Sequence, residues 1–509
     1  MSQPANHPTN GLTNGQWGLL FLILIGLGLR AFRLDFQSMW YDEAISRLAG
    51  TWPFDEVLRF AFVDRVHPPL YFAALHGWER IGDSVYFARF FSMWWGVLII
   101  PLTFWLGRLI VDRRAAWLAA SVVALSPFDV WFAQDIRMYP LVSAWVLLAT
   151  GCFVRGLRRN RARDWIGYSL FVALAAYTHH VALFIFLPHA LFLVVHLRRW
   201  LSVFRRWALA SAAAAILYLP WLIPVLLDGG FSRTATGWIQ TPTLIDLPLT
   251  AYAFSLGVTA DWSLVWTWLP TLVWGYGSMV ALRQRLDEDR RWPRSVLIWI
   301  ILIPPIVVWV FSLRKPFYVT RYFAPLQPLA AILACAGWAT IARTRKAWLA
   351  LAAAMLVPVY LYTLFNMYFI PHYFRQDWRA AAEFLCSEQR STDQVIMPRS
   401  TINQRILLDY YCGRSVGAVS VMDPGSGEGD TAAFDAELKQ VLFGHTRVWL
   451  VIAAPPTNVH GFTWADLDQF PKSIANDPFK RELEARLRPL AEHPFLGVTL
   501  FLYEVPSNN

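Results

Sequence analysis

Ser38-Met39-Trp40-Tyr41-Asp42-Glu43-Ala44 follows the first long apolar segment of the chain almost immediately. Trp and Tyr side chains favour the membrane–water boundary, so the adjacent carboxylates Asp42 and Glu43 are expected close to the lipid headgroups. Charge is costly there, and an ionisable pair at that depth indicates a functional site. Neighbouring residues of a helix point in different directions. We therefore expect one carboxylate to face a cavity and the other to support it, although the pair would also suit the cap of a short helix that follows a membrane span.

The composition is that of a membrane protein. Of the 509 residues, 56% are hydrophobic and 16% are charged, against about a quarter charged in soluble domains, and the mean hydropathy is +0.38. A polytopic membrane protein is therefore predicted. The net charge of +10 does not indicate nucleic-acid binding, because the Lys and Arg residues cluster in short loops between apolar segments. The 4 cysteines form no Cys-x-x-Cys or Cys/His pattern, so no zinc site is indicated.

About 11 segments have the length and apolar character needed to cross a bilayer. The first, residues 17–34, lacks a small-residue cleavage site and is read as an uncleaved anchor, after a polar tail at 1–16. The other segments are 85–110, 115–132, 139–154, 165–177, 181–197, 208–227, 262–282, 295–313, 322–341 and 347–369. They predict an all-helical membrane domain at 17–370. Its first loop, 35–84, is long, with a surface helix near 55–62 and a second helix that starts at His67-Pro68-Pro69.

The loops between these segments fall into two sets that alternate along the chain. Five of them are rich in Arg and Lys, namely 111–114, 155–163, 197–206, 283–294 and 342–346. The positive-inside rule assigns them to the cytoplasm. The opposite set collects the unusual polar motifs, namely Asp42-Glu43, His67-Pro68-Pro69, Gln134-Asp135-Ile136-Arg137, Thr178-His179-His180 and 314–321. A site at the extracytoplasmic ends of the helices is therefore predicted, in a multi-pass protein of the inner (plasma) membrane.

Residues 371–509 have the mixed composition of a small α/β domain, which an odd number of spans places outside the cytoplasm. Strands are predicted at 394–397, 448–453 and 498–503, and helices at 380–386, 432–442 and 481–490. Turn residues gather at 423–427. Cys386 and Cys412 would either pair in an oxidising compartment or remain two buried thiols.

Five motifs in this order carry a resemblance to a known family. They are Trp40-Tyr41-Asp42-Glu43-Ala44, His67-Pro68-Pro69-Leu70-Tyr71, Ala133-Gln134-Asp135-Ile136-Arg137-Met138-Tyr139, Thr178-His179-His180 and Thr320-Arg321-Tyr322. Together they resemble the bacterial GT-C glycosyltransferases, in the branch of protein O-mannosyltransferases, lipid A aminoarabinose transferases and lipopolysaccharide-core galacturonic acid transferases. The similarity extends over residues 17 to about 373 and includes Arg375-Gln376-Asp377-Trp378-Arg379. It implies transfer of a sugar from a polyprenyl-phosphate donor to a lipid, glycan or protein acceptor outside the cytoplasm.

The resemblance also implies roles for individual residues. Asp42 and Glu43 would form the catalytic pair, with Asp42 as the general base on an acceptor hydroxyl and Glu43 in support. If the acceptor is an anionic phosphate, Asp42 would orient it instead. Arg137 and Arg321 would bind the departing phosphate, as guanidinium groups do bidentately. The other expected substrate-binding residues are His67, Gln134, Asp135, Tyr139, His179, His180 and Tyr322.

Several of these assignments have alternatives. Arg137 would also serve as a structural partner of Asp135 or Asp42, and Arg321 as a headgroup anchor. No cofactor is assigned, but a divalent metal held by His179, His180 and Asp135 is an alternative. For the whole chain, the alternatives are a transporter or flippase of lipid-linked sugars and a non-enzymatic envelope-assembly protein. A transporter or flippase would not need an acidic pair on the same face as the arginine motifs, and an assembly protein would use the 371–509 segment as a binding module.

Overall fold

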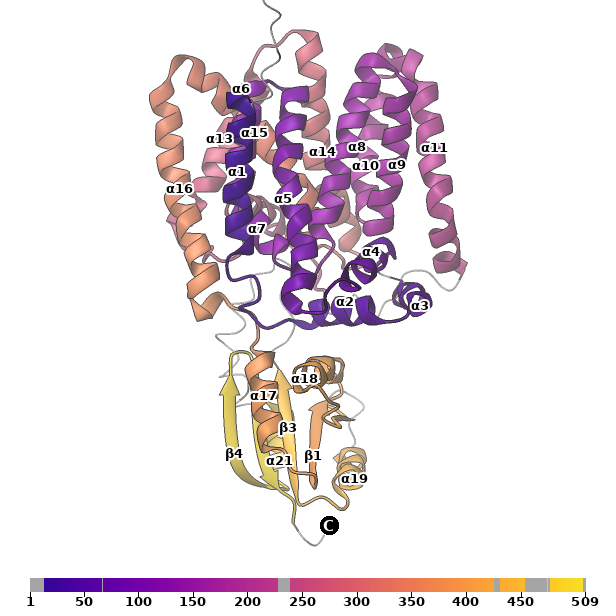
Figure 1. The fold of residues 1–509 in the computed structure, drawn as a ribbon, viewed down its shortest axis with the longest axis vertical. Coiled ribbons are helices and arrows are strands. Elements are labelled where there is room, and N and C mark those ends of the chain that lie inside the picture. Colours follow the sequence, from indigo (N-terminus) through magenta and orange to yellow (C-terminus); the bar gives the residue numbers. More distant parts are fainter. Residues whose placement is uncertain are drawn as a thin grey trace, which may run out of the picture.

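A computed structural model describes residues 13–65, 67–227, 239–424, 431–453, 474 and 477–506. The chain forms a bundle of long, nearly parallel helices with a smaller α/β domain beyond one end (Figure 1). Three short helices, α2 (Tyr41–Thr51), α3 (Phe54–Asp64) and α4 (Leu70–Glu79), lie across that end of the bundle. The architecture predicted from the sequence, a helical membrane domain followed by a small α/β domain, is confirmed.

Each segment that we predict to be membrane-spanning coincides with a helix or, once, with a bent pair of helices. The bundle is made of α1 (Asn14–Ala31), α5 (Val85–Ile110), α6 (Arg113–Leu125), α7 (Pro127–Ala133), α8 (Tyr139–Arg159), α9 (Ala162–Thr178), α10 (Ala182–Val195), α11 (Leu197–Leu227), α12 (Asp246–Leu256), α13 (Leu269–Arg283), α14 (Glu288–Ser312), α15 (Gln327–Thr344) and α16 (Lys346–Phe369). Short 3₁₀ turns, η2 (Val265–Trp268) and η3 (Thr320–Leu326), precede α13 and α15. Helix α12 was not predicted.

Not all of these helices satisfy the length and composition expected of a membrane span. Among the described residues, 7 helices do, or 8 if α6 and α7 form one span. These two helices meet at an angle of 54°, because Pro127 starts α7 and Ser126 caps it by accepting a hydrogen bond from the Asp129 N–H at 3.2 Å. Since α9, α10 and α13 fall below the length criterion, the number of 11 spans stays a prediction.

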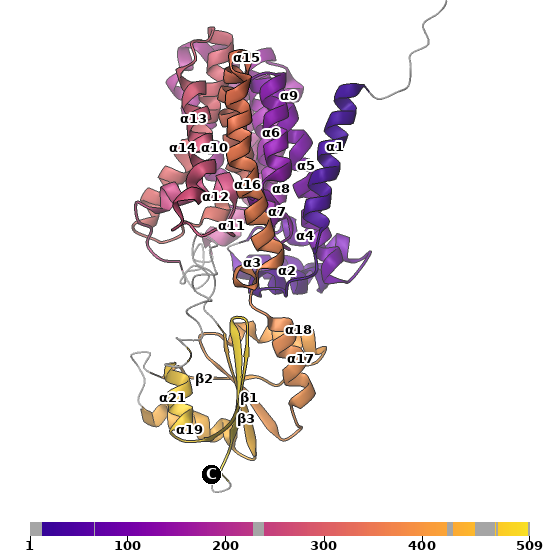
Figure 2. The same cartoon turned by 90° about the vertical axis from the view of Figure 1, so that its left-hand side faces the viewer.

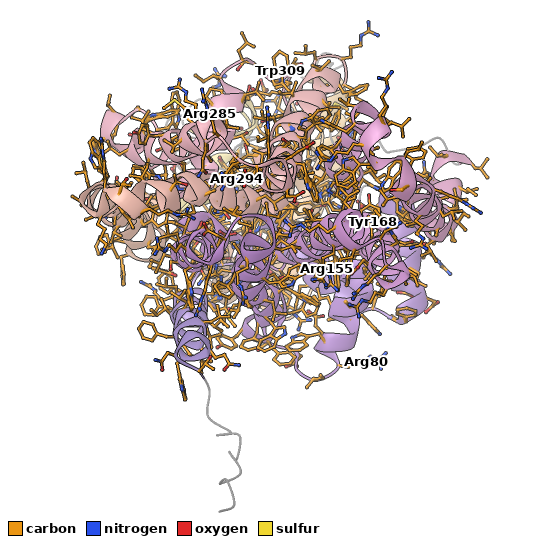
Figure 3. The ribbon with its side chains drawn as sticks, turned by 90° about the horizontal axis from the view of Figure 1, so that it is seen from above. Arg80, Arg155, Tyr168, Arg285, Arg294 and Trp309 are labelled. Carbon is orange, nitrogen blue, oxygen red and sulfur yellow. A yellow bond between two sulfur atoms is a disulfide. The ribbon has the colours of Figure 1, made fainter. Side chains whose placement is uncertain are left out.

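The ends of the helices separate the two sets of loops. The basic loops 111–114, 155–163 and 342–346 join helices at the end of the bundle away from the α/β domain (Figures 1 and 2). Figure 3 looks onto that end and labels Arg155, Arg285 and Arg294 among its side chains. The polar motifs lie at the opposite end, next to α2, α3 and α4. The predicted partition of the loops therefore corresponds to the two ends of one bundle.

The α/β domain is built on a five-stranded sheet of order β2-β1-β3-β5-β4. Its strands are β1 (Asp393–Pro398), β2 (Val419–Val421), β3 (Arg447–Ala453), β4 (Arg488–Phe495) and β5 (Val498–Glu504). Strand β1 pairs in parallel with β2 and β3, whereas β5 pairs antiparallel with β3 and β4. The three predicted strands are β1, β3 and β5. The predicted turn at 423–427 lies mostly outside the described residues.

Helices cover both faces of this sheet (Figure 2). They are α17 (Trp378–Glu388), α18 (Arg405–Cys412), α19 (Thr431–Leu442) and α21 (Pro478–Glu484), with 3₁₀ turns η4 (Pro371–Tyr373) and η5 (Ile402–Gln404). Successive strand residues face opposite sides, so Val395 packs in the core continuous with the membrane bundle, while Ile396 packs in the core under α19 and α21. The face covered by α17 and α18 is therefore the one joined to the bundle.

The helix predicted at 481–490 is wrong over its second half. Helix α21 ends at Glu484, and residues from Arg488 onward form the edge strand β4. Charged residues and prolines are unfavourable in a central strand, but an edge strand such as β4 tolerates them. The pairing of β4 is irregular between Pro489 and Ala491. Pairing with β5, which a local pattern does not reveal, decides this strand.

Candidate active site

Asp42 lies between two buried arginines at the α/β-domain end of the bundle. It is the second residue of α2, and its side chain is 25% exposed. Its Oδ2 atom is 3.8 Å from Arg137 and 3.6 Å from Arg321, whose side chains are only 3% and 7% exposed. A carboxylate that reaches solvent from between two fixed positive charges can exchange one of those contacts for a ligand. This Arg–Asp–Arg group is the centre of the candidate site.

Arg137 is held by several groups in addition to Asp42. Its guanidinium donates to the Asp42 carbonyl at 3.4 Å, to Ser46 Oγ at 3.3 Å and to His67 Nε2 at 2.8 Å. A guanidinium only donates, so His67 Nε2 accepts, and Nδ1 carries the proton that His67 donates to Asp64 at 2.8 Å. The first loop thus supplies Arg137 with acceptors from both α2 and the segment between α3 and α4.

Arg321 enters the site from η3 and lies over the ring of Trp40 at 5.2 Å. Next to it, the imidazole of His179 contacts the ring of Tyr322, with centroids 4.9 Å apart, and lies 6.5 Å from His67. Burial, reinforced by the neighbouring His67 and the two arginines, holds the pKa of His179 well below its ordinary value. His179 is therefore a neutral group beside the two cations, suited to hydrogen bonding.

Glu43 occupies a different environment from Asp42. It has no exposed surface, and its carboxylate accepts two hydrogen bonds from Arg89 at 2.9 and 2.8 Å, one from Arg375 at 2.9 Å and one from the Ile136 N–H at 3.0 Å. Burial alone would raise the pKa of Glu43, but the charges of Arg89 and Arg375 outweigh it and hold that pKa below its ordinary value. Glu43 is thus an ionised anchor with its acceptor positions occupied, and its supporting role stays a prediction.

The carboxylate of Asp135 belongs to the Glu43 cluster, and its carbonyl accepts the N–H of Arg137 at 2.7 Å. Its Oδ1 atom pairs with Arg375, which comes from the segment between α16 and α17 and lies over Trp131. Burial raises the pKa of Asp135, an effect that Arg375 opposes. Asp135 is therefore placed to hold the loop that precedes Arg137. The sequence analysis predicts instead that Asp135 binds substrate.

Three more of the predicted residues have local partners. Gln134 donates to the carbonyls of Arg30 and Phe32, each at 2.9 Å. His180 bonds the hydroxyl of Tyr218 at 2.7 Å, and burial lowers its pKa to about 4. Tyr139 packs beneath the Arg137 guanidinium. Gln134 and His180 therefore form hydrogen bonds between segments that surround the site, and Tyr139 supports the Arg137 side chain.

The structure adds residues that the sequence did not single out as site residues. Arg89 and Arg375 are the partners of Glu43, and Trp40 covers Arg321. The only sequence signal for Arg89 was a charge in an apolar segment. The three residues considered from the sequence as metal ligands have different neighbours: His180 bonds Tyr218, Asp135 pairs with Arg375 and His179 contacts the ring of Tyr322. No group of three His, Cys, Asp or Glu side chains that could hold a metal occurs among the residues that the structure describes.

Known proteins resemble this chain in sequence. The family model of dolichyl-phosphate-mannose-protein mannosyltransferases matches residues 66–223. An undecaprenyl phosphate-alpha-4-amino-4-deoxy-L-arabinose arabinosyl transferase from Yersinia enterocolitica is 23% identical over 300 residues. That alignment covers 56% of this chain and 52% of the relative, so the chain matches about half of that protein's length.

The structural comparison covers nearly the entire chain. ArnT from Cupriavidus metallidurans in the apo state matches with a TM-score of 0.62 at 12% identity, over 96% of this chain and 98% of ArnT. The chain has the GT-C fold. ArnT bound to undecaprenyl phosphate matches with a TM-score of 0.58 at 14% identity over the same shares. The Archaeoglobus fulgidus oligosaccharyltransferase has this GT-C fold too, with a TM-score of 0.53 at 13% identity over 96% of this chain and 74% of that protein. A GT-C chain with these helices is a multi-pass membrane protein.

Proposed function

We propose that this chain is a membrane glycosyltransferase that transfers one sugar from a polyprenyl-phosphate donor to a lipid, glycan or protein acceptor. The observation that carries the proposal is the partly exposed carboxylate of Asp42 between buried Arg137 and Arg321. The names of the relatives agree with it: a mannosyltransferase family that uses a dolichyl-phosphate sugar, an arabinosyltransferase that uses an undecaprenyl-phosphate sugar, and an ArnT structure that holds undecaprenyl phosphate.

The two arginines suit the departing phosphate. In the proposed reaction the bond between the sugar's anomeric carbon and the phosphate oxygen breaks, and the electron pair leaves with polyprenyl phosphate. Arg137 and Arg321 would stabilise the negative charge that develops on that oxygen, because guanidinium groups bind phosphate oxygens with charge-assisted hydrogen bonds. Neither cation has to be brought in from solvent, since Asp42 already holds both in place.

Asp42 suits the other half of the reaction. When a donor phosphate occupies the arginines, the carboxylate is displaced from them and becomes available to an acceptor. It would then accept the proton of an acceptor hydroxyl as the oxygen attacks the anomeric carbon, a transition state of oxocarbenium character that carboxylates stabilise. With an anionic phosphate as the acceptor there is no proton to remove, and Asp42 would only orient it.

The proposed side of the membrane is the extracytoplasmic one. The basic loops lie at the end of the bundle away from Asp42, and the positive-inside rule assigns that end to the cytoplasm. A cysteine introduced at Arg163 and another at Ser400, both exposed positions, test this in intact cells with a membrane-impermeant thiol reagent. Labelling of Ser400→Cys alone supports the proposal, whereas labelling of Arg163→Cys alone reverses it.

The function itself is tested with purified protein in lipid nanodiscs and a panel of polyprenyl-phosphate sugars, scored for release of polyprenyl phosphate in the presence of candidate acceptors. Release by the wild-type chain, lost in Asp42→Asn and kept in Asp55→Asn, supports the proposal. Asp55 is an exposed carboxylate of the same loop and serves as the matched control. Donor translocation that persists in Asp42→Asn, with no release from any donor by the wild type, favours a flippase.

A further inference from the structure

The peptide that leads into Asp42 is held by residues from the far end of the sequence. Residues 32–40 join α1 to α2 at the end of the bundle that faces the α/β domain. The Met39 N–H donates to the hydroxyl of Tyr411 at 2.7 Å, and the Arg379 N–H donates to Ser38 Oγ at 3.1 Å. One residue earlier, Gln37 accepts from the backbone N–H of Arg375 at 3.1 Å. Three consecutive residues of this peptide are therefore fastened to the segment and the helices that begin the α/β domain.

Arg375 adds a second attachment, inside the protein. Its guanidinium, 10% exposed, bridges Glu43 and Asp135. Glu43 adjoins Asp42 on α2, and Asp135 precedes Arg137 by two residues. The bridge thus joins the element that carries the carboxylate to the loop that carries its arginine partner. Together with Arg89 the cluster contains two carboxylates and two guanidiniums, so its charges balance only when Arg375 is present.

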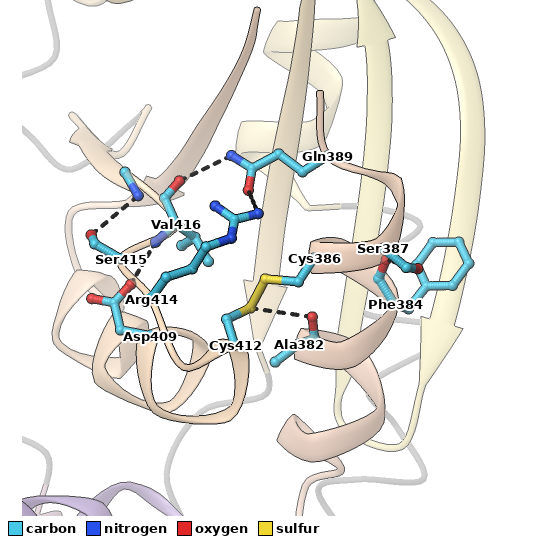
Figure 4. Close-up of a disulfide and its surroundings, with 11 residues drawn as sticks. Ala382, Phe384, Cys386, Ser387, Gln389, Asp409, Cys412, Arg414, Ser415 and Val416 are labelled. Atoms are coloured by element: carbon cyan, nitrogen blue, oxygen red, sulfur yellow. Dashed lines mark hydrogen bonds between the residues drawn. A yellow bond between two sulfur atoms is a disulfide. The ribbon is translucent and has the colours of Figure 1, made fainter. Parts of the chain in front are cut away.

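A disulfide joins the two helices that make these contacts. Cys386 of α17 is bonded to Cys412 of α18 (Figure 4). Cys412 directly follows Tyr411, and α17 also carries Arg379. Figure 4 places the disulfide at the point where the two helices meet. The contacts from α17 and α18 to the Asp42 peptide are therefore made by one cross-linked unit.

From these contacts we infer that the α/β domain positions Asp42 against Arg137, with Arg375 and Tyr411 as the positioning residues. The inference rests on the proposed function, and extends it by giving the domain a part in the reaction's geometry. Neither residue contacts Asp42 in the described structure, so each acts through the backbone of α2 or of the 134–137 loop. Displacements of about 1 Å can cost about a hundredfold in rate. A movement of that size would separate Asp42 from the two arginines, whose contacts with it are 3.6 and 3.8 Å long.

The test combines two measurements on Tyr411→Phe and Arg375→Gln, with Arg375→Lys as the conservative variant. Hydrogen exchange of residues 37–43, measured without substrate, reports whether the peptide is held. Steady-state kinetics with a donor that the wild type accepts report its effect on the reaction. The control is Arg399→Gln, which breaks an exposed ion pair with Glu437 elsewhere in the same domain.

We expect exchange at Met39 to accelerate about tenfold in Tyr411→Phe and kcat to fall about 10- to 100-fold in both variants. Donor KM should change less than about threefold, because neither residue is in the proposed phosphate site. Arg375→Lys should recover part of kcat, and the control should match the wild type. In an Asp42→Asn background, Arg375→Gln should cost little more, since both changes then remove the same contribution.

Several results would overturn the inference. Unchanged exchange in Tyr411→Phe contradicts positioning whether or not any donor is turned over. Accelerated exchange with an unchanged kcat shows that the peptide's order does not matter to the reaction. Additive losses with Asp42→Asn indicate a purely structural role. If Arg375→Gln does not fold, Tyr411→Phe decides alone. If the wild type releases polyprenyl phosphate from no donor while exchange still accelerates in Tyr411→Phe, the proposed function is contradicted and the positioning of the peptide by Tyr411 is supported.

Discussion

Substituting Asp42 by Asn tests the centre of the site, because the two side chains have almost the same shape and differ in charge. In the wild type the carboxylate lies 3.8 Å from Arg137 and 3.6 Å from Arg321. Two unit charges at this distance interact by about 4 kcal/mol at an effective dielectric constant of about 20. Asp42 is 25% exposed, so solvent screening brings each contact below that value.

The substitution should therefore act in opposite directions on donor binding and on turnover. Without the carboxylate, the two arginines have lost a competitor for the donor phosphate, so donor affinity should stay equal or increase. Loss of a general base typically lowers the rate by about two to four orders of magnitude. Folding should be retained, because Arg137 keeps its hydrogen bonds to His67 and Ser46.

The assay compares Asp42→Asn with wild type and the control Asp55→Asn at matched thermal stability. Donor affinity is measured by titration with polyprenyl phosphate, and turnover by its release from a sugar donor. Turnover equal to wild type would refute the catalytic role. Loss of donor affinity would refute the arrangement, because it would mean that Asp42 helps to bind the phosphate instead of competing with it.

Three further predictions follow from named contacts. Arg137→Lys keeps the charge but loses the guanidinium fork, so polyprenyl-phosphate affinity should fall roughly 10- to 150-fold, equivalent to about 1.5–3 kcal/mol for a charged hydrogen bond. The control is Arg108→Lys, an exposed arginine in the last turn of α5, and an unchanged affinity in Arg137→Lys contradicts the role. Glu43→Gln breaks a fully buried ion pair and should destabilise the protein by about 3–5 kcal/mol in thermal unfolding; full stability combined with abolished turnover would instead make Glu43 a reacting group. Reducing the Cys386–Cys412 disulfide, whose cysteines are 26 residues apart, should destabilise the α/β domain by about 3.5 kcal/mol, and an unchanged unfolding midpoint in a Cys→Ser pair contradicts this.

The sequence alone determined the fold class because its signals are local. Long apolar runs predict helices, and basic loops separated the two ends of the bundle before any contact was known. Short apolar runs between helical segments identified β1, β3 and β5. The alternation of these loops along the chain also placed Asp42, Arg137 and Arg321 at one end. These are properties of short stretches, in which the chemistry of each residue and its spacing from neighbours suffice.

Pairing between distant residues was decided only by the tertiary structure. Arg375 and its partner Glu43 are 332 residues apart, and Arg137 and Asp42 are 95 apart. No local pattern distinguishes Asp42, which reaches solvent, from its neighbour Glu43, which is sealed among Arg89 and Arg375. For the same reason the sequence did not predict the edge strand β4, which is defined by its pairing with β5. Nor did it decide whether Cys386 and Cys412 form a disulfide or remain free thiols. Burial and ion pairing depend on which surfaces the whole fold brings together, and a carboxylate's role follows from those neighbours more than from its own identity.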